Sequence, residues 1–256
     1  MISNPTPRYY RIYRLLKQAI KNLEYGFDGV LPSEHALAKK YDVSRLTIRR
    51  SLDLLQQEGL IKKHQGVGTF VSLTQAQTSP LKADINALMS SLTEMGSLTQ
   101  LKLIHFSYEA PIPWLKSLLE LEDDEQVQKS IRVRSYQEQP FSHLTTYVPE
   151  AIGRLYSRED LANHPLHELF KKNGIQVHSA DQSLTAALAD PERAAALNVE
   201  PGSALLFLRR LVKDSSGRPI EYLEAAYQPD RYEYKMKLRM LSDDKGGGWE
   251  IQNHSN

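Results

Sequence analysis

Residues 31–71, LPSEHALAKKYDVSRLTIRRSLDLLQQEGLIKKHQGVGTFV, contain the pattern that decides the fold of this chain. Two short stretches with helical spacing each follow a serine, Ser33 and Ser44. Serine is a preferred helix N-cap, because its hydroxyl oxygen accepts a hydrogen bond from a free backbone N–H of the first turn. Asp42, between the two stretches, tolerates the positive φ of a tight turn. Two short helices joined in this way predict a helix-turn-helix.

The segments on both sides of this unit complete a small domain. Residues 9–23 place apolar side chains at helical spacing with basic residues between them, which predicts an amphipathic first helix. After Gly59 the period changes to two, and residues 60–64 and 69–71 predict a β-hairpin around a glycine-containing turn. The whole pattern predicts a winged helix-turn-helix over residues 1–72.

The third predicted helix concentrates basic side chains at its N-terminal end. If Ile48, Ser51, Leu52 and Leu55 form its buried face, the arginines of its first turns lie at the surface. A recognition helix presents its N-terminal residues to the major groove, where arginine binds guanine or phosphate. A charged face that contacts only solvent is the alternative. The residues expected to contact DNA are Ser33, Ser44, Arg45, Leu46, Thr47, Arg49, Arg50, His64 and Gly66, with Lys63 and Gly68 nearby.

Charge is divided unevenly along the chain. The net charge of the 256 residues is only +1, yet the first 75 residues contain 12 Lys and Arg against 6 Asp and Glu, and the remainder contains 20 against 25. A basic module joined to a mildly acidic one is the electrostatic pattern of a nucleic-acid-binding protein with a second task. Uneven surface charge without functional meaning is the alternative.

The composition excludes several classes of protein. With 0 cysteines, disulfide frameworks, thiolate nucleophiles and cysteine-ligated metals are excluded. Hydrophobic residues make up 41% and charged residues 25%, as is ordinary for soluble proteins. The sequence lacks both the run of about 18 apolar residues that a membrane span needs and an N-terminal signal core. We therefore expect a cytoplasmic protein without membrane contact.

The rest of the chain predicts an α+β domain on an antiparallel sheet. We expect a linker over residues 73–81, a second domain over 82–241 and a flexible tail over 242–256. Two hairpins, over residues 131–148 and 205–227, contain most of the strand signal. The other expected elements are a strand over residues 101–108 and helices around residues 84–95, 114–119, 165–173 and 191–198.

Arg132 and Arg134 lie on the same face of a predicted strand, because successive side chains alternate between faces. Two adjacent guanidinium groups repel each other unless something anionic lies between them. A bound phosphate or carboxylate meets this need, and so does Glu138 or Glu221 in a surface ladder; the residues alone leave both open. Glu221 and Tyr227 also share a face and offer an acceptor and a hydroxyl to a ligand, with cross-strand packing as the alternative.

The first domain resembles the winged helix of GntR-family transcription regulators over nearly all of residues 9–71. The resemblance implies a dimeric bacterial repressor in which Arg45, Thr47, Arg49 and Gly66 contact operator DNA. The residues that carry it are Leu31-Pro32-Ser33-Glu34, Leu37-Ala38, Tyr41-Asp42-Val43-Ser44-Arg45-Leu46-Thr47-Ile48-Arg49, Leu55, Glu58-Gly59-Leu60-Ile61 and Gly66-Val67-Gly68-Thr69-Phe70-Val71.

The second domain resembles the UTRA effector domain of the HutC subfamily, whose fold is similar to chorismate lyase. In phosphosugar-sensing relatives the paired arginines hold phosphate with a serine-containing loop, which Ser90 and Ser91 match. The glutamate and tyrosine that match Glu221 and Tyr227 line the same pocket. The matching pieces are Arg132-x-Arg134, Tyr147-x-Pro149, the helix over residues 166–174, Gly217-x-Pro219-Ile220-Glu221-Tyr222 and Asp230-Arg231-Tyr232.

Three departures from the UTRA pattern bear on the ligand. Leu144 replaces a glutamate of many relatives, Pro165-Leu166-His167 replaces Ser-Leu-Tyr, and Gln228-Pro229 replaces Arg-Gly. An amino-sugar phosphate is therefore disfavoured. Another sugar phosphate, a phosphonate or a carboxylate such as urocanate remains open, and His167 is either a pocket donor or a surface histidine.

Together these patterns predict a homodimeric repressor that binds a palindromic operator in double-stranded DNA and is released by a small anionic metabolite. A constitutive DNA-binding protein without an effector is one alternative, and a lyase-like enzyme is another. The enzyme is disfavoured because the sequence has no nucleophile motif or phosphate-cradling glycine loop, and His164-x-x-His167 lacks a third metal ligand. No cofactor or metal is expected.

Overall fold

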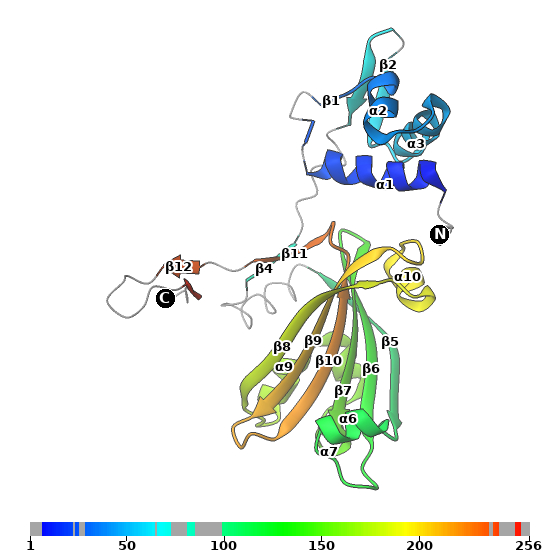
Figure 1. Cartoon of the computed structure of the whole chain (residues 1–256). Coiled ribbons are helices and arrows are strands. Elements are labelled where there is room, and N and C mark those ends of the chain that lie inside the picture. The colour runs from blue at the N-terminus through cyan, green and yellow to red at the C-terminus, as the bar shows by residue number, and fades with distance from the viewer. Residues whose placement is uncertain are drawn as a thin grey trace. The chain divides into compact units, whose positions relative to one another are not determined.

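The computed structural model describes residues 7–22, 24–25, 29–64, 66–72, 81–84, 99–235, 238–240 and 249–251 (Figure 1). The chain divides into two compact units, Met1–Ser79 and Pro80–Asn256. Across the described part of the chain, no helix has both the length and the apolar character needed to cross a membrane.

The first unit is a winged helix-turn-helix, as predicted. Ser33 and Ser44 cap α2 and α3, and Asp42 adopts a left-handed φ of 51° between the two helices. Leu16, of α1, is fully buried in the core that the three helices and the hairpin share. The elements are α1 (Arg8–Lys21), β1 (Val30–Leu31), α2 (Glu34–Tyr41), α3 (Arg45–Gln57), β2 (Ile61–His64) and β3 (Gly68–Val71).

Strand β1 was not predicted. Val30 pairs with Phe70 and Leu31 with Thr69, so the wing is a three-stranded sheet with β3 in the middle. Two residues are too few to show a period of two, and the pairing depends on a partner about forty residues away in the sequence. The extra strand ties the wing to the segment that precedes α2.

The second unit is built on a six-stranded antiparallel sheet in the order β5-β6-β7-β10-β9-β8. The two predicted hairpins, β6–β7 and β9–β10, lie side by side because β7 pairs with β10. The edge strand β8 was not predicted. The strands are β5 (Gln100–Glu109), β6 (Val127–Tyr136), β7 (Gln139–Pro149), β8 (Val177–Leu188), β9 (Ala204–Asp214) and β10 (Pro219–Tyr227).

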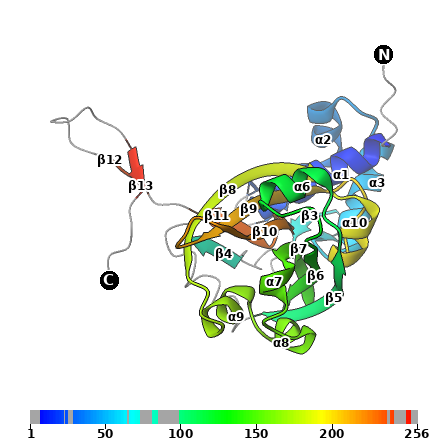
Figure 2. The same cartoon turned by 90° about the horizontal axis from the view of Figure 1, so that it is seen from below.

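Helices cover both faces of this sheet. On one face α7, α8 and α9 pack in a cluster with Val212 and Ile220, and on the other α6 and α10 pack near Tyr222 and Ala226. Figure 2 shows α6 and α10 on the side of the curved sheet opposite α8 and α9. Helices α7 and α8 were not predicted. The helices are α6 (Pro113–Leu118), α7 (Glu150–Gly153), α8 (Arg158–Asn163), α9 (Leu166–Lys172) and α10 (Pro191–Leu197).

Two short strand pairs correct the predicted ends of the second domain. Strand β4 (Leu81–Asp84) pairs in parallel with β11 (Tyr232–Lys235), so Leu81 lies in a strand and not in the linker, and Asp84 does not begin a helix. Strand β12 (Leu238–Met240) pairs with β13 (Trp249–Ile251), a strand pair within and next to the predicted tail that was not predicted. The predictions for residues 73–80, 85–95, 242–248 and 252–256 lie outside the described residues.

Candidate functional site

The N-terminal end of α3 presents its side chains at the surface. The Ser44 hydroxyl accepts a hydrogen bond from the Thr47 backbone N–H at 3.2 Å and lies 2.9 Å from the Thr47 hydroxyl. The next residues project outward: the Arg45 side chain is 65% exposed and Leu46 is 58% exposed. An exposed leucine beside an exposed arginine at a helix N-terminus suits an apolar and anionic surface such as duplex DNA.

Arg49, one turn further along α3, is held by Glu34 of α2. Its Nε and Nη2 atoms donate to Oε1 and Oε2 of Glu34 at 3.2 and 3.0 Å. The hydrogen bonds from Arg49, more than the weaker attraction to Arg45 at 4.0 Å, hold the pKa of Glu34 below its ordinary value. The Arg49 side chain stays 54% exposed, so it is both oriented and accessible.

The remaining predicted DNA contacts lie on the same unit. Arg50 is exposed on α3, and the Ser33 hydroxyl is used as the N-cap of α2. In the wing, His64 is exposed and its ring packs edge-on to Phe70, with 5.3 Å between centroids. Gly66 has a φ of +75°, which favours glycine, and its missing Cβ would meet no atom within 4 Å. That position is therefore restricted by its backbone and not by crowding.

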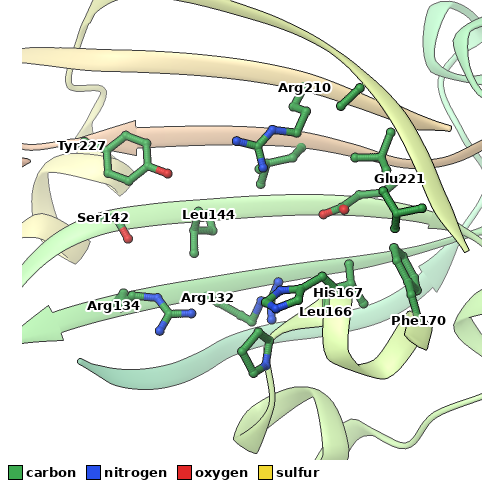
Figure 3. A pocket seen from close by; sticks show the side chains of 15 residues that line it. Arg132, Arg134, Ser142, Leu144, Leu166, His167, Phe170, Arg210, Glu221 and Tyr227 are labelled. Carbon is green, nitrogen blue, oxygen red and sulfur yellow. The ribbon is translucent and has the colours of Figure 1, made fainter. Parts of the chain in front are cut away.

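A cavity opens on the face of the six-stranded sheet that α9 covers. The space between its lining side chains, including the part that is open to solvent, is ≈ 850 Å³. Figure 3 shows side chains from β6, β7, β9, β10 and α9 directed into one space. The lining residues are Arg132, Arg134, Ser142, Leu144, Pro165, Leu166, His167, Phe170, Val177, Ala180, Arg210, Val212, Glu221, Leu223 and Tyr227.

The structure brings together five of the seven residues predicted to bind an effector. Arg132 and Arg134 line the cavity from β6, Glu221 and Tyr227 from β10, and His167 from α9. These residues were predicted from the alternation of side chains along a strand and from the family resemblance. The alternation holds for β6 and for β10, because the two predicted residues of each strand face the same cavity. The other two, Ser90 and Ser91, lie outside the described residues.

Arg132 is the least satisfied of these side chains. It is 5% exposed, and its Nε and Nη1 atoms are buried without a hydrogen-bond partner among the described residues. Burial lowers its pKa to about 10, although nearby Glu221 favours the charged form. No ion pair with Glu138 or Glu221 within 4.0 Å joins it in the described part of the chain, so the surface ladder considered for this strand is not formed there.

Arg134 and the buried polar groups of the neighbouring strands complete the polar part of the cavity. Arg134 donates from Nη1 to the Thr99 hydroxyl at 2.8 Å, and burial lowers its pKa. The Ser142 hydroxyl is buried without a partner in the described residues. Burial raises the pKa of the Glu221 carboxyl, while Arg210 and Arg132 act in the opposite direction. The cavity therefore combines guanidinium groups with a single carboxyl.

Arg210 is a cavity residue that the sequence analysis missed. It is 8% exposed, comes from β9, and donates from Nε to the Gln182 Oε1 atom at 2.7 Å. Its cross-strand partner is Leu223, which has the same parity as Glu221 and so faces the cavity too. The register of the predicted β9–β10 hairpin could have revealed it. Arg209 and Arg210 are adjacent and lie on opposite faces of the strand, so the strand alone does not show which of them faces the cavity.

Two of the three departures from the UTRA pattern, at Leu144 and at residues 165–167, also line the cavity. Leu144 and Phe170 supply apolar surface, and Pro165 caps α9 without a side-chain hydrogen bond. His167, in the first turn of α9, has its pKa lowered by burial, with Arg134 and Arg132 adding to the effect against Glu168. The histidine is therefore a neutral pocket residue near neutral pH and not a surface histidine.

A second cavity lies on the opposite face of the sheet, and its charges are largely paired. Arg193 contacts Asp190 at 2.7 Å and Glu224 at 3.5 Å, and Lys129 lies 3.4 Å from Glu109. The contrast with the unpartnered Arg132 identifies the first cavity as the candidate binding site. Among the described residues, no group of three His, Cys, Asp or Glu side chains could hold a metal ion.

Comparisons with known proteins match both units. Residues 8–71 match the family described as "Bacterial regulatory proteins, gntR family", and residues 94–233 match the family described as "UTRA domain". The chain is 26% identical over 239 residues to the transcriptional repressor NagR of Bacillus subtilis, covering 93% of this chain and 98% of NagR. It is 26% identical over 210 residues to the histidine utilization repressor of Pseudomonas putida, covering 82% and 84%. The crystal structure of PhnF from Mycobacterium smegmatis has a TM-score of 0.55 at 20% identity, covering 88% of this chain and 97% of PhnF, which shows the fold.

Proposed function

From the premise that this chain belongs to the GntR family, in its HutC subfamily with a UTRA effector domain, we propose that it is a repressor released from a palindromic operator by a small anion. Membership makes the chain a transcription regulator and not an enzyme. The operator symmetry, the homodimer and the class of effector are the parts that we propose.

The observation that carries the effector proposal is the buried guanidinium of Arg132, whose Nε and Nη1 atoms have no hydrogen-bond partner among the described residues. Buried N–H groups of a guanidinium that lack an acceptor destabilise a folded protein, so their presence in an open cavity favours a ligand that supplies the acceptor. Arg134 and Arg210 line the same cavity, and Glu221 is the carboxyl among them. Three guanidinium groups against one carboxyl favour an anion that also has a hydrogen-bond donor for Glu221.

The apolar lining narrows the class of anion. Leu144, Phe170 and Leu223 face the same space as the guanidinium groups. A polyhydroxylated sugar would leave its hydroxyls unsatisfied against such a wall, whereas a flat or partly apolar body would pack on it. We therefore favour a carboxylate or phosphonate with an apolar body. The similarity to a histidine utilization repressor adds urocanate as a concrete candidate.

The DNA-binding proposal rests on the surface formed by α3 and the wing. Arg45 and Leu46 are exposed, and Arg49 is oriented by Glu34. A homodimer would place two such surfaces on half-sites about one helical turn apart. The effector would then favour a dimer geometry that no longer fits this spacing, which is a coupling free energy between two sites.

The first experiment is a thermal-shift screen of the full-length protein against sugar phosphates, phosphonates and carboxylates that include urocanate. A ligand that binds only the folded state raises the melting temperature by mass action. A true effector must lose its shift in Arg132→Met and keep it in Arg218→Met. Arg218 is the matched control because it is an exposed arginine of the same domain, paired with Asp214 on the β9–β10 turn.

The second experiment measures release from DNA. An operator is selected from random duplexes with the full-length protein, and its Kd is measured by fluorescence anisotropy with and without each hit. A hit that weakens operator binding supports the proposal. If no compound of these classes shifts the melting temperature, or if every hit leaves the operator Kd unchanged, the chain is a constitutive DNA-binding protein instead.

A further inference from the structure

Gln182, on the edge strand β8, lies between the cavity and a short strand outside it. Its Oε1 atom accepts the hydrogen bond from Arg210 Nε at 2.7 Å, and its Nε2 atom donates to the Tyr234 hydroxyl of β11 at 2.5 Å. Gln182 is also the cross-strand partner of Arg210. The three side chains therefore form one continuous chain of hydrogen bonds from the cavity to β11.

The direction of these hydrogen bonds is set by chemistry. A guanidinium group only donates, so the amide oxygen of Gln182 must face Arg210, and the amide nitrogen must face the hydroxyl of Tyr234. The amide of Gln182 fits both neighbours, because its oxygen accepts from Arg210 while its nitrogen donates to Tyr234. A displacement of the guanidinium therefore changes both bonds and not only the nearer one.

Strand β11 is joined to the cavity by a second contact. The ring of Tyr227, which lines the cavity, stacks on the ring of Tyr232 with 3.9 Å between centroids and 12° between planes. Tyr232 and Tyr234 are residues of β11 that pair with Leu81 and Ala83 of β4. Two cavity residues are thus linked to the strand that pairs with β4: Tyr227 contacts it directly, and Arg210 reaches it through Gln182.

Strand β4 has a special place in the chain. It is the first element after β3, the last strand of the DNA-binding unit, and only residues 72–80 connect the two strands. Any shift of β11 that moves β4 acts on the end of this connection. Strand β8 can follow a shift of Arg210, because it is an edge strand with a single neighbour and is exposed over most of its length.

We propose that Gln182 and Tyr234 are positioning residues that transmit occupancy of the cavity at Arg210 to the β4–β11 pair, and through it to the connection with the DNA-binding unit. The inference rests on the proposed function and adds the path by which effector binding reaches the connection to the DNA-binding unit. An anion that binds Arg210 displaces its guanidinium group. The hydrogen bonds of the Gln182 amide transmit this displacement to Tyr234. The role is indirect, because neither residue has to touch the effector.

The sharpest variant is Tyr234→Phe, which removes the last hydrogen bond of the chain and leaves the bond between Arg210 and Gln182 in place. The matched control is Tyr136→Phe. Both tyrosines are half-buried against the same apolar cluster, and the Tyr136 hydroxyl has no hydrogen bond among the described residues. Gln182→Met, which breaks both bonds at similar side-chain volume, is the second variant.

The experiment uses the full-length protein, the selected operator, and two probes tested separately, inorganic phosphate and urocanate. The Kd of each probe is measured by titration calorimetry, and the Kd of the operator by anisotropy with and without saturating probe. In the wild type and in Tyr136→Phe, we expect the probe to weaken operator binding by roughly the 5- to 150-fold that is typical of allosteric coupling. In Tyr234→Phe and Gln182→Met, we expect the ratio of the operator Kd with probe to the operator Kd without probe to fall towards one. The operator Kd without probe should be unchanged. In Tyr234→Phe, the probe Kd should also stay at the wild-type value.

The possible outcomes distinguish a failure of the Gln182–Tyr234 route from a failure of the proposed anion-responsive function. If the wild type responds and Tyr234→Phe and Gln182→Met respond equally well, the route is wrong and the proposed function stands. If Tyr136→Phe loses its response as fully as Tyr234→Phe, the effect is one of packing and the route is also wrong. If neither these two probes nor any compound of the thermal-shift screen binds the wild type and changes its operator Kd, the anion-responsive function fails and the route fails with it.

Discussion

Glu34 and Arg49 form a two-point ion pair that joins the first turn of α2 to the exposed face of α3, with N–O distances of 3.2 and 3.0 Å. The pair uses Nε and Nη2 and leaves Nη1 for another acceptor. A guanidinium oriented in this way loses less conformational freedom when it binds a base edge. A carboxylate at this position repels the phosphates of a duplex that does not fit, so we expect the pair to contribute to selection as well as to orientation.

Glu34→Gln should therefore weaken discrimination between DNA sequences. Loss of the carboxylate charge frees Arg49 and removes a repulsion, and we expect affinity for a scrambled duplex to rise by about 1 kcal/mol, the scale of an exposed ion pair. Affinity for the selected operator should change less. Anisotropy titrations with both duplexes measure the ratio of the Kd for the scrambled duplex to the Kd for the operator. If Glu34→Gln leaves this ratio unchanged, the pair has no role in selection.

The two α3 arginines should differ when each is removed. Arg49→Ala is expected to cost about 1–3 kcal/mol of operator binding and to relax specificity at one base pair, because the residue is positioned as a base reader. Arg45→Ala should weaken all duplexes alike and reduce the salt slope by about one, as for a phosphate contact. Titrations of operator variants over a range of salt concentrations separate the two patterns. Arg218→Ala, in the other domain, is the control, and equal losses there would point to net charge alone.

Arg132→Met should make the ligand-free protein more stable and unable to bind the anion. The substitution replaces a buried guanidinium that lacks two hydrogen bonds by an apolar side chain, and we expect a gain on the order of 1–3 kcal/mol in the free energy of unfolding. Chemical denaturation without ligand measures this gain. A lower stability of the variant would mean that Arg132 is structural and that the cavity needs no anion.

Anion binding should become tighter as the pH falls. In the ligand-free protein, burial lowers the pKa of His167, with Arg134 and Arg132 acting in the same direction. A bound anion favours the protonated imidazole, so binding takes up a proton and the Kd decreases as the pH falls through the pKa of His167 in the complex. Calorimetry in buffers of different ionisation enthalpy measures the proton uptake. His167→Asn should bind with a flatter pH dependence, and an unchanged profile would exclude His167 from the site.

The DNA-binding unit could be predicted almost completely from sequence, because its signals are local. The caps at Ser33 and Ser44 and the left-handed turn at Asp42 each act within one helical turn, and the wing strands are adjacent in the sequence. The pairing of Arg49 with Glu34 was not predicted, since it joins two helices whose crossing depends on the packed core.

The effector cavity could be predicted only in part. Arg132, Arg134, Glu221 and Tyr227 followed from strand parity, which needs no knowledge of the neighbouring strands. Arg210 was not predicted, although the register of the β9–β10 hairpin places it opposite Leu223, and its hydrogen bond to Gln182 depends on the register between β9 and the unpredicted β8. Helix α9 likewise reaches the cavity through tertiary packing, which explains why His167 remained ambiguous.

The amino-acid sequence by itself determined the two-domain organisation, the recognition helix and the parity that aims two arginines at one face, because each depends on interactions between near neighbours in the chain. Only the tertiary structure decided that Arg132 is buried with two N–H groups that lack a partner in the described part of the chain, that Arg210 lines the same cavity, and that Gln182 connects this cavity to β11. Burial and hydrogen bonding between distant strands depend on how the sheet is ordered and covered, and no local pattern encodes that order.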